Sequence, residues 1–139
     1  SDFQIGKAQK LSDGKDVSIF ACGHWVWKAV EAGKILEEKG YSVELINIHT
    51  IKPLDKDAVI ASIQKTGCAV TAEEHNILGG LGDSIAQVAA TNHPIPIEYI
   101  GTKDTFGESG KPVDLLKKYG LDTPDIVAAA EKAIARKKG

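Results

Sequence analysis

The chain has 139 residues, 42% of them hydrophobic, which suits one domain with one core and leaves no room for a second substantial core. Its formal net charge is −2, and Lys and Arg are scattered except at residues 136–138, a pattern typical of a solvated helix end. This distribution argues against a nucleic-acid partner. No apolar segment approaches the roughly 20 residues that a membrane-spanning helix needs. We therefore expect a cytoplasmic protein that binds neither nucleic acid nor a membrane.

The cysteines and histidines do not predict a metal site. Cys22 and Cys68 are the only cysteines, and they lack the CxxC spacing of a zinc or redox motif. The four histidines are dispersed along the chain and form no recognisable set of ligands. We expect two reduced thiols in the core and no structural metal.

The first half of the chain predicts strands that alternate with helices. The expected elements are a weak strand at residues 3–11, a buried strand at 17–22, a helix at 25–39, a strand at 41–48 and a helix at 55–66. Asp55 is placed to cap the second helix, while Gly40 and Gly67 follow the two helices as stop signals. Trp25 and Trp27 lie two positions apart at a helix start, so we expect one in the core and one exposed or covered by a partner.

The centre of the chain predicts a strand, a loop and a helix. An apolar run at residues 68–72 is followed by the polar triplet 73–75, by glycines, and by apolar residues at helical spacing from Leu81 onward. After this unit, we expect a strand at residues 97–100 that Gly101 ends, and a glycine-rich loop at 102–110. A brief helix at 112–119 and a last helix that Thr123 caps complete the chain.

This alternation predicts an α/β fold with a parallel sheet and helices on both of its faces. If the strand at residues 17–22 is central, the chain reverses direction beyond the carboxyl ends of this strand and of the strand that begins at Ala69. Open α/β sheets usually bind ligands at such a reversal point. The loops at residues 23–24 and 73–75 are expected to face each other there. We call this edge of the sheet the rim.

Two kinds of chemistry are open to the rim. Gly79 and Gly80 precede a helix whose first N–H groups are suited to an anion, although the same glycines also serve simply to turn the chain. Glu73, Glu74 and His75 are candidates for general acid and base if burial shifts their titration toward neutrality. Adjacent residues at a strand end point to opposite faces, so the two glutamates are not expected to work as a close pair. We expect one of them to hydrogen-bond a neighbouring loop or subunit.

Three motifs, taken with their order and spacing along the chain, resemble the C-terminal domain of transketolases. They are TAEEHNILGGLG at residues 71–82, HTIKPLD at 49–55 and DTFGESG at 104–110, and the closest likeness is to the short, two-subunit type. Related forms of the first motif occur in deoxyxylulose phosphate synthase and in the β subunit of pyruvate dehydrogenase-type decarboxylases. The resemblance covers residues 3–135. It implies a three-layer α/β/α sandwich in which residues 3–11 form an antiparallel edge strand beside the strand at 41–48.

The resemblance also implies a parent enzyme larger than this chain. The resemblance implies that the parent enzyme has two stacked domains besides this one. They bind the pyrimidine and diphosphate ends of thiamine diphosphate, together with a divalent metal. A transketolase moves a two-carbon ketol unit from a ketose phosphate to an aldose phosphate in the pentose phosphate pathway. The GDG metal motif of the cofactor domain is absent here. We therefore expect one domain over residues 1–139, part of a longer subunit in a homodimer or heterotetramer, that holds no cofactor and is inactive alone.

The rim supplies the candidate residues for interdomain and subunit contacts, with a small anion as a further possibility. The candidates are His24, Glu74, His75, Gly79 and Gly80, with Phe106, Gly107 and Glu108 nearby. Two other hypotheses stay open. One is a free-standing module that binds a nucleotide or a phosphorylated metabolite at the rim, and the other is the same domain of a deoxyxylulose phosphate synthase.

Overall fold

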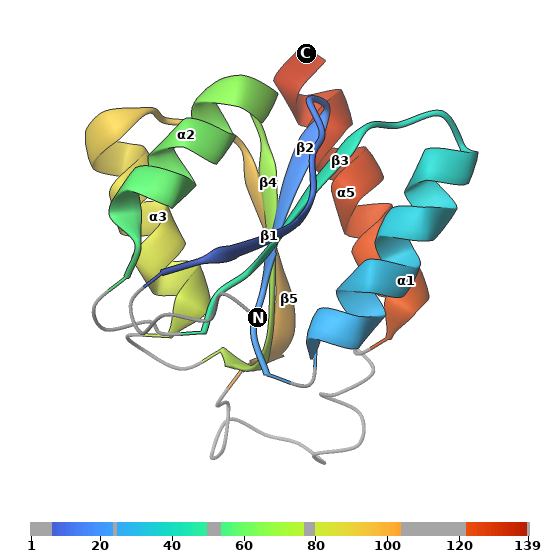
Figure 1. The fold of residues 1–139 in the computed structure, drawn as a ribbon, viewed down its shortest axis with the longest axis horizontal. Helices are drawn as coiled ribbons and strands as arrows, with labels where there is room; N and C mark the ends of the chain where they lie inside the picture. The colour runs from blue at the N-terminus through green and yellow to red at the C-terminus, as the bar shows by residue number, and fades with distance from the viewer. Residues whose placement is uncertain (1–6, 24, 50–53, 77–79, 104–121, 139) are drawn as a thin grey trace.

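A computed structural model describes residues 7–23, 25–49, 54–76, 80–103 and 122–138 of the chain. Strands and helices alternate along it, as the sequence predicts (Figure 1). The elements are β1 (Gln9–Ser12), β2 (Val17–Ala21), α1 (Trp25–Glu38), β3 (Val43–Asn47), α2 (Lys56–Thr66), β4 (Ala69–Asn76), α3 (Leu81–Asn92), β5 (Ile97–Lys103) and α5 (Thr123–Lys138). None of these helices is long and apolar enough to cross a membrane.

The strands form one five-stranded sheet in the order β1-β3-β2-β4-β5. β2 pairs in parallel with β3 on one side and with β4 on the other, and β5 pairs in parallel with β4. β1 runs antiparallel to β3 at the edge of the sheet. The predicted central strand, reversal point and antiparallel edge strand are confirmed. β1 covers only part of the predicted residues 3–11, and residues 1–6 lie outside the described residues.

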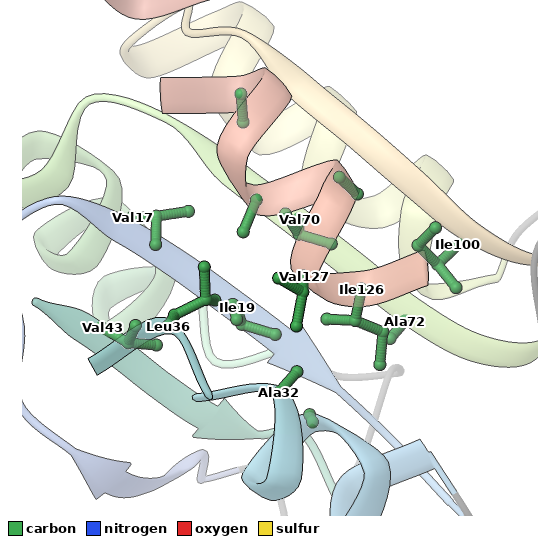
Figure 2. Packing of buried hydrophobic residues seen from close by; sticks show 14 of the residues in the cluster. Val17, Ile19, Ala32, Leu36, Val43, Val70, Ala72, Ile100, Ile126 and Val127 are labelled. Carbon is green, nitrogen blue, oxygen red and sulfur yellow. The ribbon is translucent and has the colours of Figure 1, made fainter. Parts of the chain in front are cut away.

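Helices cover both faces of the sheet, which makes the three layers of the predicted sandwich. α1 and α5 pack against one face through an apolar cluster, in which Val17 and Ile19 of β2 lie near Val70 of β4 and Ile126 of α5 (Figure 2). α2 and α3 cover the other face around Phe20 (Figure 1). Because side chains alternate along a strand, successive residues of β2 serve different layers.

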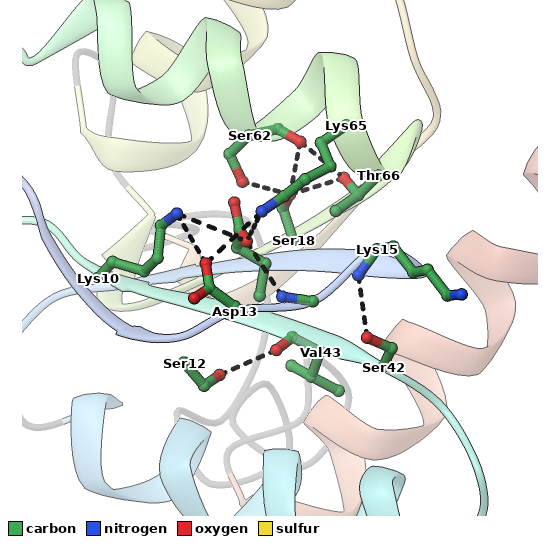
Figure 3. Close-up of polar contacts among 12 residues, drawn as sticks. Lys10, Ser12, Asp13, Lys15, Ser18, Ser42, Val43, Ser62, Lys65 and Thr66 are labelled. Atoms are coloured by element: carbon green, nitrogen blue, oxygen red, sulfur yellow. Dashed lines mark hydrogen bonds and ion pairs between the residues drawn. The ribbon is translucent and has the colours of Figure 1, made fainter.

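The face under α2 and α3 also carries buried polar groups. The Ser18 hydroxyl lies 2.6 Å from the Ser62 hydroxyl and 2.6 Å from the Thr66 hydroxyl, so the middle strand is tied to α2 by hydrogen bonds (Figure 3). Lys137 of α5 reaches the same end of the sheet, where its Nζ donates to the carbonyls of Asp16 and Thr66 at 2.7 Å each. A helix C-terminus leaves carbonyls without partners, so Lys137 also satisfies one at the end of α2.

Most of the predicted helix ends are confirmed. Asp55 accepts a hydrogen bond from the Ala58 amide at 3.2 Å and caps α2, and Gly67 ends that helix in the left-handed conformation at φ 78°. The prediction that Thr123 caps the last helix is wrong by one residue, because α5 already includes Thr123. The Thr123 hydroxyl instead donates to Glu31 of α1 at 2.9 Å, which ties the two helices together.

Two predicted strand ends are wrong. β5 does not stop at Gly101, and β4 does not stop before the polar triplet but continues to Asn76. A Cβ at Gly101 would lie 2.5 Å from the carbonyl oxygen of Glu73. This glycine therefore permits the close approach of two strands and does not mark a turn. The predicted helix at residues 112–119 lies outside the described residues.

Candidate functional site at the carboxyl ends of the strands

The rim is built where β2 and β4 end beside the starts of α1 and α3. The amide of Cys22, just after β2, donates to the carbonyl of Ala72 in β4 at 3.2 Å, so the two strands remain joined up to this edge. α1 starts on one face of the sheet and α3 on the other (Figure 1). The rim therefore has the topology that the sequence predicts for the reversal point.

Glu73 is the residue around which this edge is organised. Its side chain is only 5% exposed and points toward the start of α3. Oε1 accepts a hydrogen bond from the Leu81 amide at 3.0 Å, and Oε2 accepts one from the Gly82 amide at 2.7 Å. The first amides of a helix have no partner within the helix and carry partial positive charge. One carboxylate thus satisfies two amides and sits at the favourable end of the α3 dipole.

Two glycines lie beside Glu73, and one of them, Gly101, makes room for its backbone. A Cβ at Gly82 would lie 3.0 Å from the ring of Tyr99 and 3.4 Å from Oε2 of Glu73. At Gly101, the added atom would strike the backbone of Glu73 itself. The carboxylate is therefore enclosed by the end of β4, the first turn of α3 and the middle of β5. We call Glu73, Leu81, Gly82, Tyr99 and Gly101 the Glu73 socket.

The residues around Glu73 also include a thiol. Burial raises the pKa of the Cys22 thiol to about 11, and the negative charge of Glu73 contributes to this shift. A thiol with such a pKa is almost entirely protonated at neutral pH and is a poor nucleophile. The prediction of two core thiols holds for Cys68, which is buried, whereas Cys22 is only partly buried against the core and is not a reactive group.

The two tryptophans divide as predicted. Trp25 is buried, with 4% of its surface exposed, whereas Trp27 is 55% exposed. The Nζ of Lys28 lies 4.7 Å from the centroid of the Trp25 ring and 5.7 Å from that of Trp27. Both distances are within the range of a cation–π interaction. A large aromatic side chain at the start of α1 is thus held in place while it remains exposed beside the rim.

The structure describes only some of the candidate residues. Gly80 is the N-cap of α3, and because it has no side chain it does not cap the helix with a side-chain hydrogen bond. Glu74 and His75 lie on β4, where His75 pairs with Thr102 of β5, but their side chains lie outside the described part of the chain. The other candidates, which also lie outside the described residues, are His24, Gly79, Phe106, Gly107 and Glu108.

Glu73 is the residue that sequence reasoning undervalues. Alternation along the strand separates Glu73 from Glu74, and one of the two is expected to bond to a neighbouring segment. The structure shows that Glu73 does so, with the first turn of α3. A carboxylate a few residues before a glycine-rich helix start is the signal that could have identified it.

The comparison with known proteins gives the family. Residues 6–126 match the family model described as the transketolase C-terminal domain. The chain belongs to this family. It is 42% identical, over 98% of its length, to the 6-deoxy-6-sulfo-D-fructose transketolase subunit SqwH of Clostridium sp. (strain MSTE9), and covers 42% of that protein. It is 36% identical, over 93% of its length, to an apulose-4-phosphate transketolase subunit of Phocaeicola vulgatus, and covers 41% of it.

A solved structure shows the same fold. The protein titled "Split gene transketolase, inactive beta4 tetramer" superimposes with a TM-score of 0.85 at 43% identity, over 97% of this chain and 44% of that one. The chain thus spans about two-fifths of the length of these relatives.

The start of α3 does not fit the diphosphate of the cofactor that the family implies. A diphosphate would need free amides or cations, but the amides of Leu81 and Gly82 at the start of α3 are bonded to Glu73. A divalent metal would need a cluster of suitable side chains, and the part of the chain that the structure describes has no group of three or more His, Cys, Asp or Glu residues arranged to hold one. We derive no catalytic step through thiamine diphosphate in this domain.

Proposed function

We propose that this chain is the C-terminal domain of a thiamine-diphosphate-dependent transketolase, which transfers a two-carbon ketol unit between ketose and aldose phosphates. The observation that carries the proposal is the match of almost the whole chain to proteins named transketolase subunits, of which it covers only about two-fifths. In this proposal, the pyrimidine- and diphosphate-binding domains lie in the rest of the parent enzyme, with the cofactor and its metal.

We further propose that this domain supports assembly and is inactive alone. Glu73 already occupies the start of α3, where the glycines suggest an anion, so an external phosphate would have to displace a buried carboxylate. This disfavours the hypothesis of a free-standing phosphate- or nucleotide-binding module. The exposed Trp27 beside the rim favours a contact surface, since tryptophan is enriched in protein interfaces.

The assembled enzyme tests the proposed activity. The natural polypeptide that carries this sequence, with any partner subunit, is assayed for ketol transfer from a ketose phosphate to an aldose phosphate in the presence of thiamine diphosphate and Mg²⁺. The 139-residue chain is assayed alone in parallel. We expect transfer by the assembly and none by the chain alone. Formation of 1-deoxy-D-xylulose 5-phosphate by the assembly, without ketol transfer, would identify a deoxyxylulose phosphate synthase instead.

A substitution at the rim tests the proposed contact. Glu74→Ala is expected to weaken dimerisation of the full enzyme more than it weakens folding of this domain. Sedimentation velocity at nanomolar concentration measures the first effect, and urea unfolding of the domain measures the second. An enzyme that remains fully dimeric at nanomolar concentration would remove Glu74 from the interface.

A further inference from the structure

We propose that Glu73 is a positioning residue of the rim: its carboxylate acts as an internal anion that fixes the end of β4 for the subunit contact. The inference rests on the proposed function, because it assigns a role within the same contact surface. It adds a buried residue that acts through the residues following it on β4 and not by touching the partner subunit.

The pairing of β4 with β5 is irregular at Glu73. Ala72 pairs with Ile100 and His75 pairs with Thr102, so three steps along β4 correspond to two along β5. One extra residue is therefore accommodated at positions 73 and 74. A β-bulge of this kind is uncommon in parallel pairs and re-aims the side chains that follow it. The orientation of the strand end at the rim thus depends on how this bulge is held.

The Glu73 socket holds the bulge. The backbone ladder is shifted here. The Glu73 carboxylate accepts hydrogen bonds from the amides of Leu81 and Gly82, and these two bonds tie β4 to α3. On the other side, the carbonyl of Glu73 lies so close to Gly101 that β5 has no room for a side chain there. The strand end is therefore fixed from two directions by one residue. Glu74 and His75 come next on the same strand, and both are candidates for the contact surface.

The carboxylate is suited to this role by its charge as well as its shape. Hydrogen bonds from backbone amides to an ionised group are roughly twice as strong as bonds between neutral groups. An amide side chain of the same size accepts from one of these amides but presents its own N–H groups to the other. Glutamine at position 73 would therefore fill the socket without holding both amides.

The test uses the full polypeptide with its partner subunit and compares Glu73→Gln with Glu44→Gln. Glu44 is a matched control because it is also buried, on the same sheet face, and accepts a hydrogen bond from the Gly14 amide at 3.1 Å, but it lies away from the rim. Assembly constants come from sedimentation velocity and stability from urea unfolding. Glu73→Gln is expected to weaken assembly at least tenfold, and Glu44→Gln less than twofold.

Chemical rescue tests whether the Glu73 socket requires an anion. Glu73→Ala lacks one methylene and the carboxylate, which together correspond to acetate. Added acetate is therefore expected to restore assembly of Glu73→Ala, whereas chloride at equal ionic strength is not. Rescue by acetate supports the inference.

Two results would overturn the inference. The first is that assembly of Glu73→Gln and of Glu44→Gln weakens only in proportion to the stability that each variant loses. The second is that acetate restores assembly of Glu73→Ala no better than chloride does. Failure of the proposed function looks different, because the wild-type assembly would then transfer no ketol unit. An active wild-type enzyme whose Glu73→Gln variant assembles normally would refute the positioning role alone.

Discussion

Two buried carboxylates on the same face of the sheet are stabilised in different ways. Glu44 of β3 is 1% exposed and lies near the amino ends of the parallel strands, where Lys65 of α2 forms an ion pair with it at 2.5 Å. Lys65 and Lys10 also surround Asp13 beside it (Figure 3). Glu73 lies at the carboxyl ends, where it accepts hydrogen bonds from the backbone amides of α3.

The difference concerns what each carboxylate fixes. The lysines that neutralise Glu44 are partly exposed and have flexible stems, so they compensate its charge without setting the backbone precisely. The amides that hold Glu73 belong to the first turn of a helix and cannot move without moving the helix. Glu44 thus holds one loop amide, that of Gly14, and otherwise balances lysine charge, whereas Glu73 holds two amides at the start of a helix.

The glycines beside the two carboxylates provide the largest expected effects. A Cβ at Gly14 would lie 2.2 Å from the carbonyl carbon of Val43, and one at Gly101 would lie 2.5 Å from the carbonyl oxygen of Glu73. Because both obstacles are backbone, Gly14→Ala and Gly101→Ala should each reduce the free energy of unfolding by about 3 kcal/mol. Urea unfolding measures this. Gly82→Ala is the control, since its obstacle is the movable ring of Tyr99, and it should cost less than about 1 kcal/mol.

The second-largest effect is expected from replacing the two carboxylates, and the loss of stability should differ between them. Glu73→Gln leaves a buried amide of α3 unsatisfied, so we expect it to lower the free energy of unfolding by about 2 kcal/mol. Glu44→Gln leaves Lys65 free to turn into solvent, and about 1 kcal/mol is expected. Urea unfolding of both variants under one set of conditions provides the comparison. Equal losses would mean that backbone and lysine partners are equivalent here.

Salt should separate the two sites further. The ion pair of Glu44 with a partly exposed lysine is screened by ions, whereas the bonds of Glu73 are buried. Raising the salt concentration to roughly 1 M should shrink the effect of Glu44→Gln by about half and leave that of Glu73→Gln unchanged. The difference in unfolding free energy between each variant and wild type is measured at both salt concentrations. A parallel decrease at both sites would contradict the distinction.

The smallest expected effect is on the Cys22 thiol. Its folded pKa is about 11 against an ordinary value of 9.0, so its alkylation rate should keep rising with pH well above 9. Glu73→Gln removes a nearby negative charge and should increase that rate modestly at pH 9. Because the folded state holds the proton more tightly, the stability from the neutral thiol is complete below pH 9 and is lost between pH 9 and about 11. A rate that levels off near pH 9 would show that the thiol is exposed.

The sequence predicts the fold well because it is encoded locally. Apolar strands, helical spacing, the Asp55 cap and the Gly67 stop each depend on a few neighbouring residues, and the structure confirms them. The interpretation of Gly101 as a strand end is wrong because its role depends on a strand that lies far away in sequence. The same limit applies to Glu73, whose partners become evident only when β4 and α3 are placed side by side.

The antiparallel edge strand is predictable only through the family resemblance. β1 is short and carries exposed Lys10 and Leu11, so its composition alone gives a weak strand signal. Its partner β3 is separated from it by β2 in the sequence. Pairing between segments that are not consecutive is set by the whole sheet, which a local pattern does not contain.

The position of α5 has a consequence for the order in which this domain is completed during synthesis. α5 shares with α1 the task of covering one face of the sheet, and Lys137 in its last turn binds carbonyls beside the first parallel strand and α2. When β2, β3 and β4 have left the ribosome but α5 has not, only α1 covers this apolar face. Nascent chains at that stage expose a surface that chaperones recognise. Closure of this core therefore waits for the synthesis of α5, and substitutions in α5 should reduce the yield of folded protein in cells more than their effect on equilibrium stability implies.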